Sequence, residues 1–147
     1  MTFRNSLVIM ALALSTACGH AVKGPVLALD STDIDLDTVS YNAPRVVKYD
    51  LRVRNEGDVN LVLKDFRVDC DCTKAEADTC VIAPGETSLI HVSIQFFIPQ
   101  SEPFAKRLTI ITNDTVNSPV DVIFRGQAKF IKPVYSTPSQ RRRYSQN

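Results

Sequence analysis

The sequence predicts an all-β domain, an immunoglobulin-like antiparallel β-sandwich of about seven strands. Residues 45–55 alternate apolar and polar side chains, and this period of two excludes an amphipathic helix. Turn-forming residues recur at short intervals, as in Asn-Glu-Gly-Asp at 55–58 and Ala-Pro-Gly-Glu at 83–86. No helical periodicity appears in the chain that follows the N-terminal leader.

The leader, residues 1–17, has the three-part layout of a secretory signal peptide. A single cation, Arg4, precedes an uninterrupted apolar run at 7–14, which is far shorter than the roughly 20 residues of a transmembrane helix. Small residues follow and lead to Cys18, an arrangement that resembles the lipobox of a bacterial lipoprotein. We therefore expect Cys18 to be acylated with palmitate-type chains and to be the first mature residue.

Two alternatives to this cleavage remain open. Ser15 stands where a lipobox usually has Leu, and cleavage after Ala17 or Ala21 would release a soluble secreted protein. The expected location is the bacterial cell envelope, with the domain anchored in a membrane and facing the periplasm or the exterior. Either route delivers the chain to an oxidising compartment.

The sandwich is expected to span residues 25–130, after a short polar spacer at 18–24. Residues 25–29 and 33–37 are predicted to form two pieces of one edge strand, because a Pro opens the first piece and cannot donate to a ladder. The second piece alternates Asp with Ile and Leu, which places its aspartates toward solvent.

Residues 45–55 are the clearest strand, with Val47, Tyr49, Leu51 and Val53 on the inner face. A tight turn follows, in which Gly57 is expected to take a positive φ. Residues 60–68 are the next strand. Phe66 and Val68 are out of phase with Leu61 and Leu63, which predicts a β-bulge near residues 64–65.

Residues 73–79 are polar and short, so they are predicted to form a loop before a short strand at 80–82. A type II turn at 83–86 leads into a long strand at 87–98. The strand's inner face is expected to carry Ile90, Val92, Ile94 and Phe96, and its outer face His91. Strands at 104–112 and 120–129 complete the sandwich.

Charge is unevenly distributed along the chain. Residues 23–129 carry 12 lysines and arginines against all 16 acidic residues, a net charge of −4, which argues against nucleic-acid binding by the folded domain. Residues 131–147 contain Pro, Ser and four cations without an acid, so they are predicted to be a basic disordered tail. Arg141, Arg142 and Arg143 are candidates for contact with a polyanion.

The order of motifs resembles a bacterial, mostly exported family of unknown function with a Hydin-like (ASH-type) immunoglobulin fold. The matching pieces span residues 46–128 and are the Asn-Glu-Gly-Asp turn, a Leu-rich strand, Cys70-Asp71-Cys72-Thr73, Pro84-Gly85-Glu86, Thr112-Asn113-Asp114 and Gly126. Family members commonly have Gly between the two cysteines, where this chain has Asp71. The resemblance implies fold and compartment, and it implies no catalytic residues.

Cys70, Cys72 and Cys80 are candidates for a disulfide. On an extended strand the Cα atoms of Cys70 and Cys72 would be roughly 7 Å apart, and a bond between them would close a small strained ring. Pairing of Cys80 with Cys70 or Cys72 across a short loop is therefore the preferred expectation, and it leaves one spare thiol. Asp69 and Asp71 disfavour a reactive thiolate and hence a redox-active pair.

A soft-metal site is the alternative use of the cysteines. Cys70, Cys72 and Cys80, with His91, offer ligands for Cu(I) or Zn(II), but their spacing matches no standard zinc motif. His91 is otherwise expected to be an ordinary surface residue, and His20 an inert residue of the spacer.

These observations predict a non-enzymatic binding or structural module. No Ser-His-Asp order, phosphate-binding Gly loop or carboxylate pair indicates catalysis, so no catalytic residue and no cofactor are expected. A protein partner is expected to bind the edge at residues 26–36 by strand addition, or the cysteine loop. A periplasmic metal-binding or redox protein is the alternative function.

Overall fold

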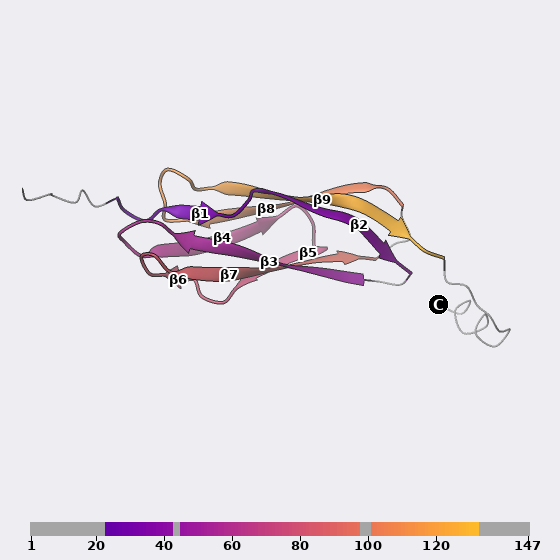
Figure 1. The fold of residues 1–147 in the computed structure, drawn as a ribbon, viewed down its shortest axis with the longest axis horizontal. Helices are drawn as coiled ribbons and strands as arrows, with labels where there is room; N and C mark the ends of the chain where they lie inside the picture. The colour runs from indigo at the N-terminus through magenta and orange to yellow at the C-terminus, as the bar shows by residue number, and fades with distance from the viewer. Residues whose placement is uncertain (1–22, 43–44, 98–100, 133–147) are drawn as a thin grey trace, which may run out of the picture.

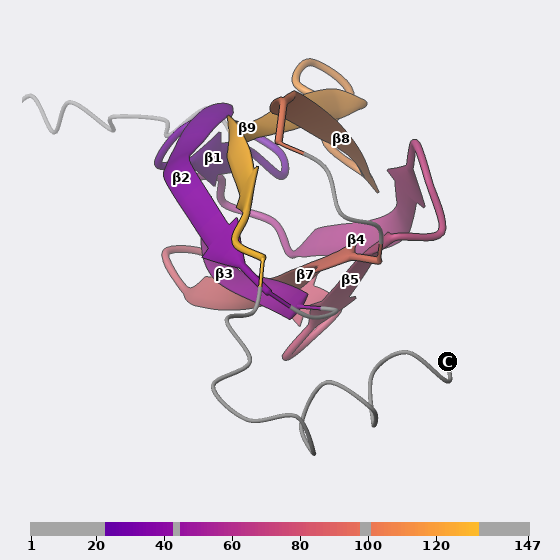
Figure 2. The ribbon, with the colours of Figure 1, turned by 90° about the vertical axis from the view of Figure 1, so that its right-hand side faces the viewer.

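The computed structural model describes residues 23–42, 45–97 and 101–132, and these form two stacked β-sheets (Figures 1 and 2). None of the described residues is in an α-helix, and none belongs to a helix that could cross a membrane. The strands are β1 (Leu27–Leu29), β2 (Asp33–Tyr41), β3 (Arg45–Asn55), β4 (Leu61–Val68), β5 (Thr73–Ala77), β6 (Val81–Ile82), β7 (Thr87–Phe96), β8 (Pro103–Thr112) and β9 (Val120–Phe130).

The predicted all-β sandwich is confirmed. One sheet has the order β1-β3-β7-β5 and the other the order β2-β9-β8-β4-β6. Every paired strand is antiparallel to its neighbour except β2, which runs parallel to β9. There are nine described strands instead of about seven, because the expected first edge is two strands and one expected loop is a strand.

The prediction of a single N-terminal edge is wrong. β1 pairs with β3 in the four-stranded sheet, whereas β2 pairs with β9 in the five-stranded sheet, so the chain changes layers at residues 30–32. The pattern within β2 is as predicted, since Ile34 is buried and Asp33 and Asp35 are exposed. Alternation identifies a strand and its inner face, but it does not identify the sheet that the strand joins.

The prediction of a loop at residues 73–79 is also wrong. Residues 73–77 form β5, which pairs antiparallel with β7 from Thr73 opposite Ile94 to Ala77 opposite Ile90. Thr73 is buried and Ala75 and Ala77 are half-buried, while Lys74 and Glu76 are exposed. The alternation is present, but small side chains on the inner face gave it a weak apolar signal.

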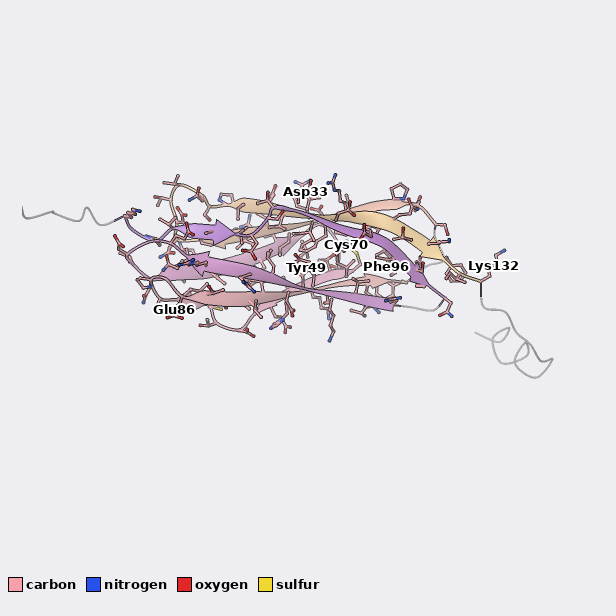
Figure 3. The ribbon with its side chains drawn as sticks, in the orientation of Figure 1. Asp33, Tyr49, Cys70, Glu86, Phe96 and Lys132 are labelled. Carbon is pink, nitrogen blue, oxygen red and sulfur yellow. A yellow bond between two sulfur atoms is a disulfide. The ribbon has the colours of Figure 1, made fainter. Side chains whose placement is uncertain are left out.

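The core lies between the two layers and is built mainly by β3, β7, β8 and β9. Figure 3 shows Tyr49 and Phe96 between the sheets. The Tyr49 ring meets Phe124 edge-on from the opposite sheet, at 5.6 Å between ring centroids. The inward positions predicted for these strands are all buried or half-buried: Val47, Leu51, Val53, Ile90, Val92, Ile94, Leu108, Ile110, Val120 and Val122.

The predicted bulge in β4 is confirmed, because the register with β8 shifts between Leu63 and Asp65. The turn at 83–86 also forms as predicted: Gly85 has a φ of 78° and the Glu86 N–H donates to the Ala83 C=O at 3.0 Å. Gly57 differs from the prediction, since it is not at positive φ. A Cβ at Gly57 would overlap the Gly24 carbonyl oxygen, so close approach of two backbones requires the glycine.

Several predicted features lie outside the described residues. They are the leader, the candidate acylation site Cys18, the spacer residue His20, and the basic tail with Arg141, Arg142 and Arg143.

Candidate functional site at the cysteine turn and the β5 edge

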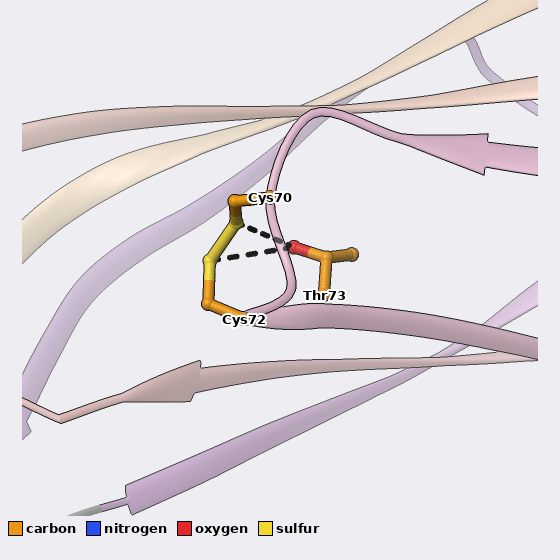
Figure 4. Close-up of a disulfide and its surroundings, with 3 residues drawn as sticks. All are labelled: Cys70, Cys72 and Thr73. Carbon is orange, nitrogen blue, oxygen red and sulfur yellow. Dashed lines mark hydrogen bonds between the residues drawn. A yellow bond between two sulfur atoms is a disulfide. The ribbon is translucent and has the colours of Figure 1, made fainter.

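The turn between β4 and β5 contains a disulfide that joins Cys70 to Cys72 (Figure 4). Their Cα atoms are 5.2 Å apart, because the backbone folds into a turn here and is not extended. The Thr73 N–H donates to the Cys70 C=O at 3.1 Å, and the Thr73 hydroxyl lies 3.7 and 3.9 Å from the two sulfur atoms. The disulfide and Thr73 together hold the turn from which β5 starts.

The preferred expectation of a bond to Cys80 is wrong. Cys80 is exposed and carries a free thiol. Its C=O accepts a hydrogen bond from the Leu63 N–H at 2.8 Å, which places it near the beginning of β4. Cys70 follows the other end of β4, roughly 20 Å away along an extended strand. The cause is β5 itself, because a strand at 73–77 carries the chain away from Cys72.

The structure does not bring together the cysteines and His91 of the predicted alternative, a metal site. Cys72 lies beside Gln95, four positions along β7 from His91, or roughly 13 Å. Cys80 lies near the beginning of β4, whereas Cys70 and Cys72 follow its other end. Across the ranges that the structure describes, no group of three or more His, Cys, Asp or Glu side chains is arranged to hold a metal ion.

β5 is an edge strand with unused hydrogen-bonding groups. It pairs with β7 alone in the four-stranded sheet. The Gln95 N–H donates to the Cys72 C=O at 2.7 Å and the Asp78 N–H to the Leu89 C=O at 3.0 Å. Because bonding direction alternates along an antiparallel strand, Lys74 and Glu76 also bond to β7, while Ala75 and Ala77 direct their N–H and C=O groups away from the sheet.

No hydrogen bond within the described part of the chain reaches the main chain of Ala75 or Ala77. The exposed N–H and C=O groups of an edge are a template for another strand. The open edge of β5 begins at the disulfide-held turn, so Cys70 and Cys72 lie next to it. The sequence does not reveal this edge, because Thr73, Ala75 and Ala77 give its inner face only a weak apolar pattern.

Beside the edge, His91 on β7 connects to carboxylates on either side. Its Nδ1 lies 2.7 Å from Asp50 on β3, and its Nε2 lies 2.8 Å from Asp78, which follows β5. The pKa of His91 is raised. The hydrogen bond to Asp50 is the largest cause, and the hydrogen bond to Asp78 is the second. His91 is on the outer face as predicted, but it links neighbouring segments instead of standing alone.

The surface around His91 is hollowed only slightly. The hollow has a volume of about 220 Å³, which is below the roughly 300–1,000 Å³ of pockets that enclose small ligands. Its lining is mostly charged or polar: Lys48, Asp50, Lys74, Glu76, His91, Val92 and Ser93. The hollow is therefore too small to enclose a typical small ligand.

A second depression, of about 670 Å³, lies at the bulge of β2. Asp35 and Asp37 line it, together with Arg125, which pairs with Asp33 at 3.0 Å. The Asp37 N–H donates to the Asp35 carboxylate at 2.9 Å, so the backbone already uses one of these acids. The lining of the depression therefore follows the irregular backbone of β2 between Asp35 and Thr38.

Two buried polar residues, Asn55 at the end of β3 and Asp114 after β8, bind main-chain groups of neighbouring segments. The Asn55 side chain donates to the C=O groups of Val59 and Ile82 at 2.8 and 2.9 Å and accepts from the Gly57 N–H at 3.0 Å. Asp114 accepts from the Leu27 N–H at 2.8 Å. Both belong to the motifs that carry the family resemblance, so those motifs have structural roles here.

Comparison with solved structures identifies the same fold in other proteins. A protein of unknown function from Porphyromonas gingivalis W83 superposes with a TM-score of 0.58 at 22% identity, over 78% of this chain and 51% of that one. This chain thus spans about half the length of the Porphyromonas protein. An identity this low shows a shared fold alone.

Two further structures are similar at lower scores. The ASH/PapD-like domain 7 of human CEP192 has a TM-score of 0.49 at 8% identity, over 91% of this chain and 99% of that one. The secreted serine protease VesC of Vibrio cholerae has a TM-score of 0.45 at 16% identity, over 77% of this chain and 24% of that one.

No curated protein sequence matches the chain. A family model described as "Protein of unknown function (DUF1573)" matches residues 27–128. The matched segment begins with β1 and ends within β9, so it covers both sheets of the sandwich. The chain therefore belongs to the DUF1573 family of proteins of unknown function.

Proposed function

We propose that this protein is a non-enzymatic binding module, tethered to a bacterial envelope membrane by acylated Cys18, which offers the β5 edge to a protein partner. The observation that carries the proposal is the unpaired edge at Ala75 and Ala77, next to the disulfide-held turn. Strand addition at such an edge provides main-chain hydrogen bonds, while alternate side chains select the partner.

The tether is supported by the leader and by the point where the chain enters the domain. Cys18 precedes Lys23 by five residues, a reach of at most about 18 Å. β1 then joins the end of β3 at Asn55 and forms one edge of the four-stranded sheet, whereas β5 forms the other edge of that sheet, beyond β3 and β7. A lipid at Cys18 would consequently leave the β5 edge open.

The disulfide supports the same function by holding the start of the edge in place. The bond closes at Cys70–Cys72, and Thr73 is the first residue of β5. Disulfides persist in the oxidising compartments to which a secretory leader delivers a protein. A preorganised edge loses less conformational freedom when a partner strand binds.

The tether is tested by the intact mass of the mature protein extracted from its own membrane. We expect a chain that begins at Cys18, carries acyl groups and contains one disulfide. The Cys18→Ser variant should lose the acyl mass and the membrane association together. A mature chain that begins at Val22 without acyl groups would contradict the tether.

The edge is tested by a photo-reactive amino acid placed at position 74, with the same group at position 54 as the control. Lys74 lies on the edge strand, whereas Arg54 is also exposed but lies on β3, an interior strand of the same sheet. We expect protein adducts in the native envelope from position 74 and few from position 54. Equal adducts from both positions, or none from position 74, would contradict use of the edge.

A further inference from the structure

We infer that the partner of the β5 edge is a second copy of this chain, which pairs β5 to β5 in antiparallel orientation about a twofold axis at Ala75. This inference rests on the proposed use of the edge and names its occupant. A twofold interface brings the same surface of both copies together, so the edge must be complementary to itself. The sequence of β5, Thr-Lys-Ala-Glu-Ala, meets that condition.

Hydrogen-bonding direction restricts the possible registers. Only Thr73, Ala75 and Ala77 direct main-chain groups away from β7, so bonds between copies must join residues of this set. Three registers bond the central Ala75 to a member of this set: Ala75 opposite Ala75, Thr73 opposite Ala75, or Ala75 opposite Ala77. The exposed residues Lys74 and Glu76 then occupy the alternating, non-bonded positions.

Charge selects one of the three registers. With Ala75 opposite Ala75, each Lys74 lies directly opposite Glu76 of the second copy, and two opposite-charge pairs form. With Thr73 opposite Ala75, Lys74 faces Lys74. With Ala75 opposite Ala77, Glu76 faces Glu76, and each Lys74 faces Asp78, whose carboxylate is already bonded to His91. Directly opposed side chains on one face have Cβ atoms roughly 4.5–5.5 Å apart, so opposite charges stabilise the first register and like charges oppose the others.

The main chain can complete the central register. The Ala75 pair exchanges both of its N–H···O bonds across the axis. On either side, the Ala77 N–H of one copy donates to the Thr73 C=O of the other. The Thr73 N–H is already used by Cys70, so the disulfide turn marks the end of the ladder. The small side chains of Ala75 and Ala77 leave room for a neighbouring strand on the inner face.

The other sheet edges are less suited to this pairing. β2 has a bulge between Asp35 and Thr38, and the Arg45 guanidinium donates to its Ser40 C=O at 2.7 Å. β1 has three residues and β6 has two. Bulges, charges and shortness are the features that protect edges from added strands. A foreign strand would need a Glu and a Lys in matching positions, which a second copy supplies by symmetry.

The test is sedimentation velocity of the mature full-length chain with Cys18→Ser and Cys80→Ser, which removes the acyl group and the free thiol. We expect a concentration-dependent dimer. Lys74→Glu and Glu76→Lys each turn both attractive pairs into repulsive ones, so each should raise the dissociation constant by about tenfold or more. Arg54→Glu is the matched control, since it changes an exposed charge on an interior strand and should leave the dimer intact.

Mixing the two charge variants gives the sharpest result. An equimolar mixture of Lys74→Glu and Glu76→Lys chains places opposite charges at both pairs, so a heterodimer should form at concentrations at which each variant alone is mostly monomeric. The double variant Lys74→Glu/Glu76→Lys should also dimerise. Unchanged thermal unfolding of each variant shows that the fold is retained.

The inference is overturned if the parent chain stays monomeric at all concentrations, or if its dimer ignores the charge changes and the mixture shows no heterodimer. The proposed function fails in a different way. If the chain is monomeric but position 74 forms adducts with another protein in the envelope, the edge is used and only its occupant was wrong. If position 74 forms no adducts, the use of the edge itself is contradicted.

Discussion

At the scale of single residues, Asp114 connects the two layers of the sandwich. The residue is 2% exposed, and its carboxylate accepts hydrogen bonds from the N–H groups of Leu27, Val116 and Asn117 and from the Asn117 side chain, at 2.8–3.1 Å. Burial acts to raise the Asp114 pKa, but the hydrogen bonds from Leu27 and Asn117, followed by Val116, together lower it to about 2. The ionised carboxylate is therefore part of the fold.

Replacing Asp114 by Asn should reduce the free energy of unfolding at neutral pH by roughly 2 kcal/mol, because a pKa lowered from 3.8 to about 2 reports that much preference for the charged form. Because the pKa of Asp114 is lower in the folded state, its contribution to stability is complete above the unfolded-state pKa near 3.8. The contribution is lost as pH falls toward the folded-state pKa of about 2. Urea unfolding from pH 7 to pH 2 measures both effects. The exposed Asp30→Asn is the control, and equal losses from both substitutions would contradict the role of Asp114.

The cysteines give a second prediction at this scale. In a Cys18→Ser chain, a thiol reagent should detect one thiol in the native protein, because Cys80 is exposed and Cys70 and Cys72 are bonded to each other. Cys80→Ser should remove the signal, and reduction should restore two thiols to that variant. A signal that survives Cys80→Ser and disappears with Cys70→Ser would instead indicate the pairing with Cys80.

At the scale of elements, β3, β7 and the end of β5 are linked across their outer face by His91. Asp50 lies directly opposite His91 on β3, and Asp78 reaches it from the segment that follows β5. An ionised carboxylate can only accept a hydrogen bond, so each ring nitrogen of His91 must carry a proton to bond its partner. The doubly protonated ring therefore satisfies both carboxylates. The raised His91 pKa follows from these two hydrogen bonds, that to Asp50 first.

The free energy of unfolding should fall as pH rises through the folded-state pKa of His91. A raised pKa gives a contribution that is complete below the unfolded value near 6.5 and is lost above the folded value. The effect should be small, because the side chains of His91 and its partners are half-exposed. Chemical unfolding of the parent chain and of His91→Gln between pH 5 and pH 9 measures it. A variant that keeps the parent's pH slope would show that another group is responsible.

At the scale of the whole molecule, the pairing of β2 with β9 joins the N-terminal and C-terminal parts of the domain's chain. Seven residue pairs join them in parallel, from Asp33 opposite Ile123 to Tyr41 opposite Phe130. Tyr41 packs against both Phe130 and Phe96, at 5.6 and 5.5 Å between ring centroids. The last residue of the described core is Ala128, and the ladder ends at Phe130.

A mature chain that ends at Lys132 should keep the thermal unfolding midpoint of the complete mature chain, because it retains all of β9 and the described core. A chain that ends at Arg125 removes buried Ala128 and the partners of residues 38–41, so it should lose cooperative unfolding. Calorimetry of the three chains tests this. A lower midpoint for the chain ending at Lys132 would place stabilising contacts beyond the sandwich.

Prediction from sequence succeeded where a local pattern carries the information. β3 and β7 were predicted because bulky apolar side chains alternate with polar ones, and the bulge in β4 was predicted because Phe66 is out of phase with Leu63. β5 was missed because Thr73, Ala75 and Ala77 make a weak apolar face. The missed strand led directly to the wrong cysteine pairing, since a loop would have brought Cys80 back to Cys72.

The sequence alone determined the β class, the inner faces of the long strands, the tight turns and the family, because side-chain alternation and turn chemistry act between residues close in the chain. Only the tertiary structure decided which sheet each edge strand joins, which cysteines meet, and how His91 and Asp114 are surrounded. Those features depend on segments dozens of residues apart, such as Leu27 and Asp114. Their meeting is set by the packing of the two layers, and no local pattern encodes it.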